Sequence, residues 1–244
     1  MIRRGASAAF AAVLSLAFVT LGSGSAPAQT LGQIARATST PGLLMSNEFR
    51  SESLDGLPQW TRVLDVTGRG NAFERCVADD RQCTSPTLKS WRTLIHSATG
   101  LSRREKIKVV NEFFNRWPYK RDPEVYGVSE YWATPDEFMA RSGDCEDYSI
   151  AKYFALRQLG FAKEDLRVVI LMDRIRAIGH AVLAVYHEGD ILILDSLSNL
   201  ITSHERYRHY VPQYSMNETT RWSHVRKAGV DEPKTFYQGL LARR

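Results

Sequence analysis

The chain has 244 residues, of which 43% are hydrophobic and 24% are charged, and its formal net charge is +5 at pH 7. These proportions are ordinary for a folded globular protein, and with 16 glycines, 9 prolines and 3 cysteines the chain is neither collagen-like, nor disordered and of low complexity, nor a disulfide-dense miniprotein. The length is sufficient for one domain with a substantial hydrophobic core.

The first 28 residues have the pattern of a secretory signal peptide. Two arginines precede an uncharged apolar stretch at 6–21, and an A-x-A cleavage motif follows at 26–28. We expect cleavage before Gln29, because the apolar stretch is short for a membrane span and is followed by small polar residues. An uncleaved membrane anchor is the alternative. No later segment is apolar enough to cross a membrane, so the expected location is a bacterial periplasm.

The mature chain, residues 29–244, is expected to form a single domain. Residues 29–65 are polar and mixed in character, and they predict an N-terminal arm with one strand at about 60–66. Loss of the two arginines of the signal lowers the net charge from +5 to +3, and no dense run of Lys and Arg follows. So small a charge on an exported protein argues against nucleic acid as a partner.

Three cysteines in an exported protein leave one thiol unpaired. Cys76 and Cys83 lie seven residues apart in a polar stretch that is typical of a loop, and we expect them to form a disulfide that closes this loop. Two unpaired surface thiols are the alternative. Cys145 is then the free thiol, and in an oxidising compartment such a thiol is either buried and inert or chemically used.

Three helices are predicted between residues 102 and 159. The first, at 102–117, opens with an S-x-x-E capping box and ends before Pro118. The second, from 135 to about 141, opens with threonine as N-cap, proline in the first turn and glutamate at the third position. The third begins at about Cys145, after a Ser-Gly-Asp turn, and ends before Gly160. Because this third helix is apolar on two sides, it should be central and buried.

Three short apolar runs rich in β-branched residues follow at 166–172, 180–187 and 191–196, as is typical of central strands. A Glu-Gly-Asp turn makes the second and third a hairpin. The tail has weak helix and strand signals, with Trp222 and Phe236 as expected core anchors. Helices, then a central helix, then an antiparallel sheet predict an α+β fold.

Cys145, His180 and Asp195 can supply a thiol nucleophile, its base and the acceptor that orients the base. Cys145 starts the buried helix, where the helix dipole lowers the pKa of a thiol. His180 opens the second strand of the expected sheet, and Asp195 ends the third. A nucleophilic thiol needs a base, and the imidazole needs an acceptor that fixes its tautomer. Structural roles for all three residues are the alternative, and five other histidines are competing candidates for the base.

The register of the hairpin decides whether His180 and Asp195 can meet. With a four-residue loop at 187–190, Tyr186 pairs with Ile191, and Asp195 becomes a diagonal neighbour of His180 at about 7–8 Å between Cα atoms. A two-residue loop of Gly and Asp would separate them too far. The triad therefore requires the longer loop or a bulge.

Four stretches within about residues 90–225 carry a resemblance to a known family: YWATPDEFMARSGDCEDYSIAKYFALRQLG, GHAVLAV, ILDSLSN and VPQYSMNETTRW. They resemble the bacterial transglutaminase-like cysteine proteinases, the periplasmic family that includes the LapG-type adhesin-cleaving proteases. The resemblance implies a papain-like, transglutaminase-type core in which the helix that carries the cysteine packs on an antiparallel sheet. It also implies a triad of Cys145 in GDCEDY, His180 in GHAV and Asp195 in ILDS.

Asp144, Glu146 and Asp147 crowd the thiol with carboxylates, which would raise its pKa and oppose activation. Either some of these side chains cap the helix, or a cation offsets their charge, and carboxylates are ligands of hard cations such as Ca²⁺. The resemblance implies calcium dependence, with Asp144 and Glu146 as ligands. Capping by Asp144 and exposure of Glu146 are the alternative.

The oxyanion hole is expected to include the backbone N–H of Cys145, because this amide lies at a helix start. Asn111, on the preceding helix, is a candidate for the second donor, and an exposed helix asparagine is the alternative.

Together these features predict a periplasmic cysteine endopeptidase. By resemblance, its substrate is a large surface adhesin that is cut near its N-terminus to release the cell from a biofilm. An inner-membrane receptor that senses cyclic-di-GMP would sequester the protease. A transglutaminase that transfers the acyl group to an amine is one alternative. An inactive module that binds a partner is another, although such a module need not retain all three triad residues.

Overall fold

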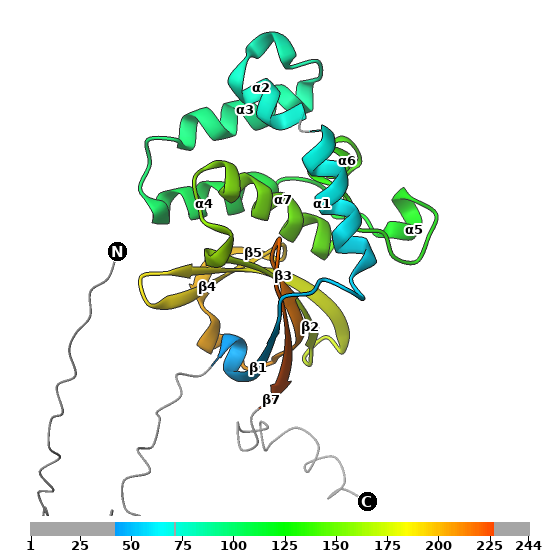
Figure 1. Cartoon of the computed structure of the whole chain (residues 1–244), viewed down its shortest axis with the longest axis vertical. Helices are drawn as coiled ribbons and strands as arrows, with labels where there is room; N and C mark the ends of the chain where they lie inside the picture. Colours follow the sequence, from blue (N-terminus) through cyan, green and yellow to red (C-terminus); the bar gives the residue numbers. More distant parts are fainter. Residues whose placement is uncertain (1–41, 71, 227–244) are drawn as a thin grey trace, which may run out of the picture. The chain divides into compact units, whose positions relative to one another are not determined.

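One antiparallel sheet of seven strands organises the part of the chain that the computed structural model describes, residues 42–70 and 72–226 (Figure 1). The strands lie in the order β1-β7-β6-β2-β3-β4-β5. Their bounds are Ser46–Ser51 (β1), Leu166–Asp173 (β2), Ile178–His187 (β3), Asp190–Asp195 (β4), Ser198–Ser203 (β5), Tyr210–Met216 (β6) and Arg221–Arg226 (β7). Each neighbouring pair is antiparallel, so the predicted α+β class is confirmed.

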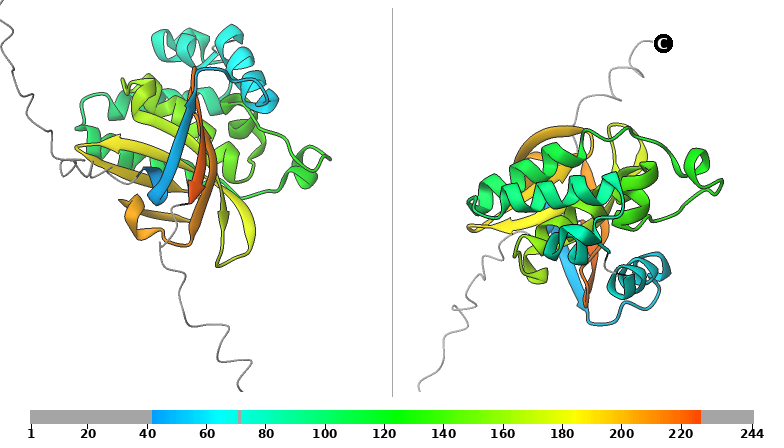
Figure 2. Two further views of the ribbon diagram at one scale, coloured as in Figure 1. Left: turned by 60° about the horizontal axis from the view of Figure 1, so that its bottom comes forward. Right: turned by 90° about the horizontal axis from the view of Figure 1, so that it is seen from above.

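The α-helices gather on one side of this sheet (Figures 1 and 2). They are Pro58–Gly70 (α1), Ala72–Ala78 (α2), Pro86–Ala98 (α3), Arg103–Phe114 (α4), Asp122–Val125 (α5), Pro135–Arg141 (α6) and Cys145–Gln158 (α7). Short 3-10 helices lie at Leu43–Met45 (η1), Asp80–Gln82 (η2), Lys163–Asp165 (η3) and His204–Arg206 (η4). Within the described residues, none of the helices combines the length and the apolar character needed to cross a membrane.

Helix α7 is the central helix that the sequence predicts. It packs on β2, β3 and β4 and also contacts α4 and α6, so protein covers it on both sides. Most of its side chains are buried, including Ile150, Ala151, Ala155 and Leu156. A helix that is apolar on several sides is stable only when it is enclosed in this way. The core helix that carries the cysteine is therefore packed on an antiparallel sheet, as expected.

The predicted helix starts are present, and one predicted end is shifted. Capping boxes at Ser102 and Thr134 begin α4 and α6. Helix α4 ends at Phe114, three residues before its expected end. The backbone then tightens into turns, because the amides of Arg116 and Trp117 bond to carbonyls three residues earlier. Such turns are frequent at the C-terminal ends of helices.

The strand expected at 60–66 is wrong, because these residues belong to α1. Trp60 and Val63 lie three positions apart and are both fully buried, which is a helical spacing. The indole nitrogen of Trp60 donates to the carbonyl of Asn217 at 2.8 Å. The strand near the N-terminus is instead β1, which pairs with β7 at the edge of the sheet. Its polar sequence, SNEFRS, gave no local signal of a strand.

The hairpin of β3 and β4 has the expected register but a shorter loop. Tyr186 pairs with Ile191 as predicted, and His187 also pairs with Asp190. The turn therefore consists of residues 188 and 189, which have φ values of 51° and 80°. Two consecutive positive φ angles match the right-handed twist of a tight hairpin. The four-residue loop was wrong, whereas the alignment that it predicted is correct.

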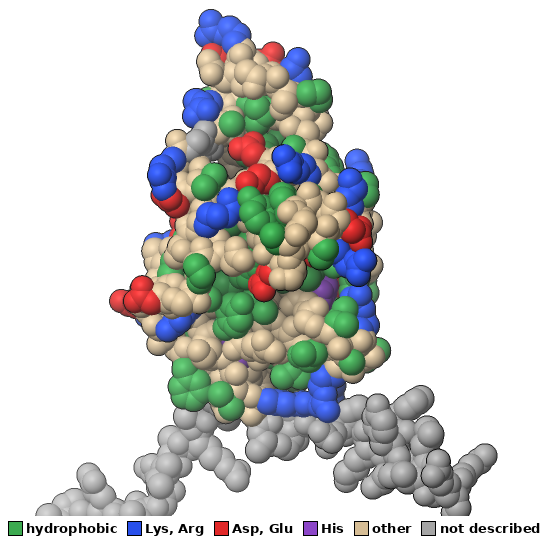
Figure 3. Space-filling model, turned by 90° about the vertical axis from the view of Figure 1, so that its right-hand side faces the viewer, with side chains coloured by type: hydrophobic (Ala, Val, Ile, Leu, Met, Phe, Trp, Pro, Cys, Tyr) green, Lys and Arg blue, Asp and Glu red, His purple; other side chains and the backbone are tan. Residues whose placement is uncertain are grey.

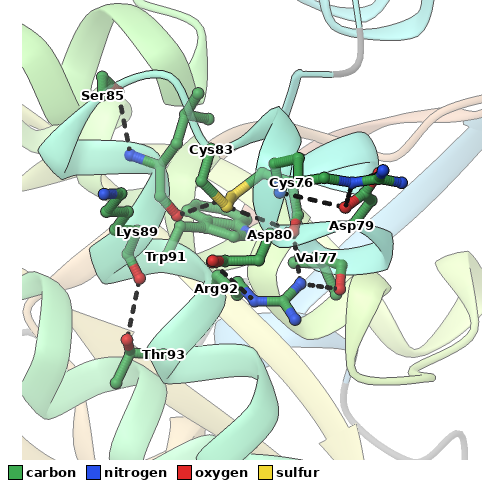
Figure 4. Close-up of a disulfide and its surroundings, with 12 residues drawn as sticks. Cys76, Val77, Asp79, Asp80, Cys83, Ser85, Lys89, Trp91, Arg92 and Thr93 are labelled. Atoms are coloured by element: carbon green, nitrogen blue, oxygen red, sulfur yellow. Dashed lines mark hydrogen bonds and ion pairs between the residues drawn. A yellow bond between two sulfur atoms is a disulfide. The ribbon is translucent and has the colours of Figure 1, made fainter.

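Cys76 and Cys83 are joined by a disulfide (Figure 4). The segment between them is not a simple loop, because Cys76 lies in α2 and η2 follows. Both cysteines are buried. The guanidinium of Arg92, on α3, donates to the carbonyls of Cys76 and Val77. The disulfide and these hydrogen bonds attach α2 to α3.

Some predicted features fall outside the described residues. They are the signal peptide at 1–28, the first part of the arm up to residue 41, and Phe236. Trp222, the other expected anchor, is buried in β7. On the face drawn in Figure 3, apolar side chains lie in separate groups among basic and acidic ones.

Candidate active site

Cys145 is the first residue of α7, and the turn before it fixes where the helix begins. The Asp147 carboxylate accepts the N–H of Asp144 at 3.1 Å, and its other oxygen accepts the N–H of Ala133 at 2.6 Å. Asp144 is the N-cap residue of α7, as the sequence alternative expected, and Asp147 at the third position completes a capping box with it. A Cβ atom at Gly143 would clash with the side chain of Asp147, so a larger residue there would displace the carboxylate that accepts these hydrogen bonds.

The thiol of Cys145 is partly exposed and has mainly acidic neighbours. Its sulfur lies 3.2 Å from Oε2 of Glu146, and the N–H of Ala181 hydrogen-bonds to it. Burial, followed by the charges of Glu146 and Asp144, raises the pKa of the thiol well above its ordinary value. The Ala181 amide opposes this rise. The resting thiol is therefore protonated as these residues stand.

His180 and Asp195 form a buried pair at the ends of β3 and β4. Nε2 of His180 lies 3.0 Å from Oδ1 of Asp195, and both side chains are almost inaccessible to solvent. The hairpin register produces this diagonal contact. Because Nε2 faces the carboxylate, Nδ1 is the ring nitrogen that remains for the thiol. The residue after His180 bonds to the sulfur of Cys145, so the start of β3 meets the start of α7.

Each oxygen of the Asp195 carboxylate has a donor. Oδ1 also accepts the N–H of Leu197 at 3.0 Å, and Oδ2 accepts the hydroxyl of Tyr210 at 2.6 Å. Burial alone would raise the pKa of Asp195, but the hydrogen bonds from His180, Tyr210 and Leu197 and the charge of His180 lower it overall. Asp195 is therefore ionised and fixed in orientation.

The backbone carbonyl of Asp195 is also held, by two side chains from the helical layer. Nζ of Lys152 donates to it at 3.1 Å, and Nδ2 of Asn115 at 3.0 Å. Lys152 is fully buried on α7, and burial lowers its pKa to about 7, against the opposing effect of Asp195. Lys152 lies two helical turns after Cys145, a spacing that was a usable signal in the sequence. Tyr210 gave no such signal.

Asn111, the expected second oxyanion donor, is buried on α4 and donates to the carbonyl of Ser198 at 3.2 Å. This contact supports the turn between β4 and β5. A role for Asn111 at the substrate carbonyl stays a prediction.

The structure gathers four carboxylates near the thiol, more than the sequence indicated. Possible ligand atoms of Asp122, Asp144 and Asp147 lie within 4.8 Å of one another, and so do those of Asp144, Cys145 and Glu146. Oδ1 of Asp122 and Oδ1 of Asp144 are buried without a hydrogen-bond partner. Asp122 precedes the cysteine by more than twenty residues, and sequence reasoning took its Asp-Pro only as part of a loop. The acidic group therefore spans α5 and α7.

These carboxylates raise one another's proton affinity. Burial, a hydrogen bond with Asp144 and the charges of Asp144 and Asp147 raise the pKa of Glu146 to about 10. Burial and the charge of Asp144 bring the pKa of Asp122 to about 6, although a backbone hydrogen bond from Tyr131 opposes this. A buried carboxylate oxygen without a partner is costly. Carboxylate oxygens that lack a hydrogen-bond donor are suitable ligands for a hard cation such as Ca²⁺.

The arrangement has the parts that acyl transfer by a thiol requires. A thiol at a helix start, a histidine on the strand whose next residue contacts that thiol and a carboxylate bonded to the histidine resemble the general pattern of covalent catalysis. The backbone N–H groups at the start of α7 are suitably oriented donors for a developing oxyanion.

Comparison with known proteins gives related sequences and structures. A family model described as bacterial transglutaminase-like cysteine proteinase matches residues 71–230. The solved structure of Legionella pneumophila LapG is 33% identical, with a TM-score of 0.54 over 62% of this chain and 87% of LapG. Its calcium-bound form is 30% identical, with a TM-score of 0.55 over 70% of this chain and 98% of LapG. Its EGTA-treated form is 33% identical, with a TM-score of 0.54 over 62% and 84%. A search of curated proteins found no match.

Proposed function

The chain belongs to the bacterial transglutaminase-like cysteine proteinases and is a cysteine peptidase, and we propose that Cys145, His180 and Asp195 are its catalytic triad. The observation that carries this proposal is the buried His180–Asp195 hydrogen bond of 3.0 Å beside the helix start that bears the free cysteine. Hydrolysis, with water as the acceptor, is preferred over transfer to an amine because the family is one of proteinases. Incorporation of an amine into a glutamine peptide would instead support a transglutaminase.

In the proposed reaction, Nδ1 of His180 takes the proton from the thiol as the sulfur of Cys145 attacks the peptide carbonyl. The carbon–sulfur bond forms, and the π electrons of the carbonyl move to its oxygen. The N–H groups at the helix start donate hydrogen bonds to the oxyanion that results. His180 then gives its proton to the leaving amine as the carbon–nitrogen bond breaks. Water, deprotonated by His180, hydrolyses the thioester and restores the thiol. Asp195 keeps the imidazole in the required tautomer throughout.

Calcium is proposed as a cofactor whose positive charge offsets the negative charge of the carboxylates near the thiol. Asp144 belongs to both carboxylate clusters, and the unpartnered oxygens belong to Asp144 and Asp122. We therefore expect these two residues to be ligands, together with Asp147 and the originally predicted Glu146. Bound Ca²⁺ would supply positive charge that lowers the pKa of the neighbouring thiol. LapG from Legionella pneumophila has a calcium-bound structure, which supports the same cofactor here.

The proposed substrate is an exported protein, bound as an extended chain. Ile178 and Leu197 lie two residues from His180 and Asp195 respectively, and they are 42% and 50% exposed. Tyr119, also 50% exposed, hydrogen-bonds to the sulfur of Cys145. Exposed apolar side chains beside a nucleophile favour an apolar stretch of polypeptide. A surface adhesin as substrate, a periplasmic location and an inner-membrane receptor are further parts of the proposal, supported by the family resemblance and by the signal-like first 28 residues.

The triad is tested by the rate at which iodoacetamide labels Cys145 in the mature chain across pH. Cys145 is the one cysteine outside the disulfide, so labelling reports on it alone. His180→Ala should slow labelling at neutral pH strongly, whereas His96→Ala, at an exposed position on α3, should not. Labelling that rises only near pH 8.5, the range of an ordinary thiol, and that is unchanged in His180→Ala would contradict the proposal.

The calcium site is tested by calorimetric titration of the EGTA-dialysed chain with CaCl₂. Asp144→Asn should abolish the binding heat, because this residue belongs to both clusters. Glu112→Gln, which neutralises a carboxylate on α4, is the matched control and should bind as the wild type does. Unchanged binding by Asp144→Asn would refute the assignment of the ligands.

A further inference from the structure

We propose that Tyr210 is a positioning residue of this peptidase, which holds the Asp195 carboxylate in the orientation that His180 requires. This inference rests on the proposed triad and adds to it a residue from β6. Tyr210 does not touch the reacting atoms, so its expected effect passes through Asp195 and His180.

The hydrogen bonds of the carboxylate carry the inference. Tyr210 donates to Oδ2 of Asp195 at 2.6 Å, while Nε2 of His180 uses Oδ1 at 3.0 Å. Because the two oxygens have different partners, the carboxylate cannot rotate about its Cβ–Cγ bond without losing one of them. Tyr210 and Asp195 are only 4% and 2% exposed, so water cannot readily replace the hydroxyl.

The ring of Tyr210 also contacts the catalytic base. Its plane meets the His180 imidazole edge to face, with the ring centroids 5.7 Å apart and an angle of 63° between the planes. Tyr207 in turn stacks on Tyr210 at 5.0 Å. One side chain therefore constrains the orienting carboxylate through its hydroxyl and the imidazole through its ring.

Packing alone does not explain why the residue at position 210 carries a hydroxyl group. Tyr210 belongs to a small apolar cluster on the sheet, with Leu44, Val182 and Ile193 among its members. A phenylalanine would fill the same space without a polar group to satisfy, and a buried tyrosine hydroxyl needs a partner. Here that partner is the carboxylate of Asp195, and this hydrogen bond is one of the contacts that lower the pKa of Asp195.

The test compares Tyr210→Phe with Tyr186→Phe in the mature chain. The control removes a buried hydroxyl that has no hydrogen-bond partner, from the same strand as His180. Iodoacetamide labelling of Cys145 is measured across pH in CaCl₂, with thermal unfolding measured in parallel. Loss of a hydrogen bond to a charged group predicts roughly tenfold slower labelling at neutral pH for Tyr210→Phe. In the plot of labelling rate against pH, the fall in rate on the acidic side should also move to higher pH, because Asp195 is protonated more readily in this variant.

A double-mutant cycle separates positioning from general packing. In an Asp195→Ala background, Tyr210→Phe should have no further effect on labelling, because the carboxylate through which Tyr210 acts is absent. The inference is overturned if folded Tyr210→Phe labels as the wild type does at every pH. It is also overturned if Tyr186→Phe slows labelling equally, or if the two substitutions are additive in the cycle. Failure of the triad itself is recognised separately, as wild-type labelling that does not depend on His180.

Discussion

His180 and Asp195 lie among donors and acceptors that satisfy one another, whereas Cys145 lies among carboxylates that do not. On the acid–base side, each carboxylate oxygen of Asp195 has a donor, and two side chains hold its carbonyl. On the nucleophile side, Asp122 and Asp144 each bury an oxygen without a partner. The Asp195 carboxylate therefore has a donor for each oxygen, whereas the acidic group beside the thiol leaves two buried oxygens unpaired.

The difference indicates which side of the site can be regulated. A buried carboxylate whose two oxygens both have donors is held rigidly and resists change. Unsatisfied carboxylates respond strongly to an added cation, because the charge that the cation offsets is large and local. We therefore expect the fold alone to preorganise the acid–base side, and the supply of calcium to control the thiol.

The largest expected effect comes from breaking the acid–base side. Asp195→Asn keeps the shape of the side chain but supports the wrong tautomer of His180, and we expect peptidase activity to fall by about 10³–10⁴-fold, as in other triads. Hydrolysis of a protein substrate measures the change. Asp190→Asn, at the other end of β4, is the control and should retain activity. Equal loss in both variants would mean that the strand, rather than the pair, had been damaged.

Removal of calcium should affect the nucleophile side alone. With EGTA, we expect labelling of Cys145 at neutral pH to slow by about tenfold to a thousandfold, because nearby uncompensated charge shifts a pKa by about 1–3 units. The low-field NMR signal of the His180 ring proton bonded to Asp195 should stay in place, since that pair has its own partners. A shift of this signal in EGTA would show that the two sides are not independent.

Lys152 carries a buried positive charge on the satisfied side, and its pKa of about 7 lies below the ordinary value of 10.5. Between these values the unfolded chain binds a proton that the folded chain does not, so the free energy of unfolding should rise with pH. We expect a gain of about 1–2 kcal/mol between pH 7 and pH 9, measured by urea unfolding. Lys152→Met should remove this gain, whereas Lys108→Met, at an exposed position on α4, should retain it.

An effect of similar size on stability, but on the acid side of neutrality, is expected from the segment that covers the cluster around Tyr210. The N–H of Leu44 donates to His204, and His224 lies between the hydroxyls of Ser46 and Ser215. Burial lowers the pKa of both histidines, that of His224 to about 4. The folded chain therefore binds fewer protons than the unfolded chain, and stability should be lost as pH falls from about 6.5 towards 4.

We expect this loss to be about 1–3 kcal/mol at pH 4.5, measured as the free energy of unfolding in urea. His224→Gln should flatten the acid limb of the stability profile. His96→Ala, at a solvent-exposed position, should leave it unchanged. A constant free energy of unfolding between pH 7 and 4.5 in the wild type would contradict the prediction.

The features predicted correctly from the sequence were those with local causes. Capping residues located α4 and α6, and the pairing of Tyr186 with Ile191, which the triad required, is the observed register. Residues 60–66 were misjudged because a helix with only two fully buried positions, Trp60 and Val63, has a weak period. Strand β1 was missed because its pairing with β7 is supplied by distant residues.

The residues missed at the site share the same physical reason. Asp122 on α5 and Tyr210 on β6 belong to other segments of the chain, and only the fold brings them near Asp144 and Asp195. Their own neighbours in the sequence contain no pattern typical of a metal ligand or of a positioning residue. Long-range placement of this kind follows from the fold and cannot be inferred from spacing.

The length of the two-residue turn between β3 and β4 fixes the alignment of His180 with Asp195. Because side chains alternate along a strand, adding or deleting one residue in this turn would move either His180 or Asp195 to the opposite face of the sheet. The turn between β2 and β3 lies outside the His180–Asp195 hairpin and carries no such restriction. Over evolutionary time, relatives should therefore vary in the length of the β2–β3 turn, while insertions and deletions in the β3–β4 turn should be eliminated by selection.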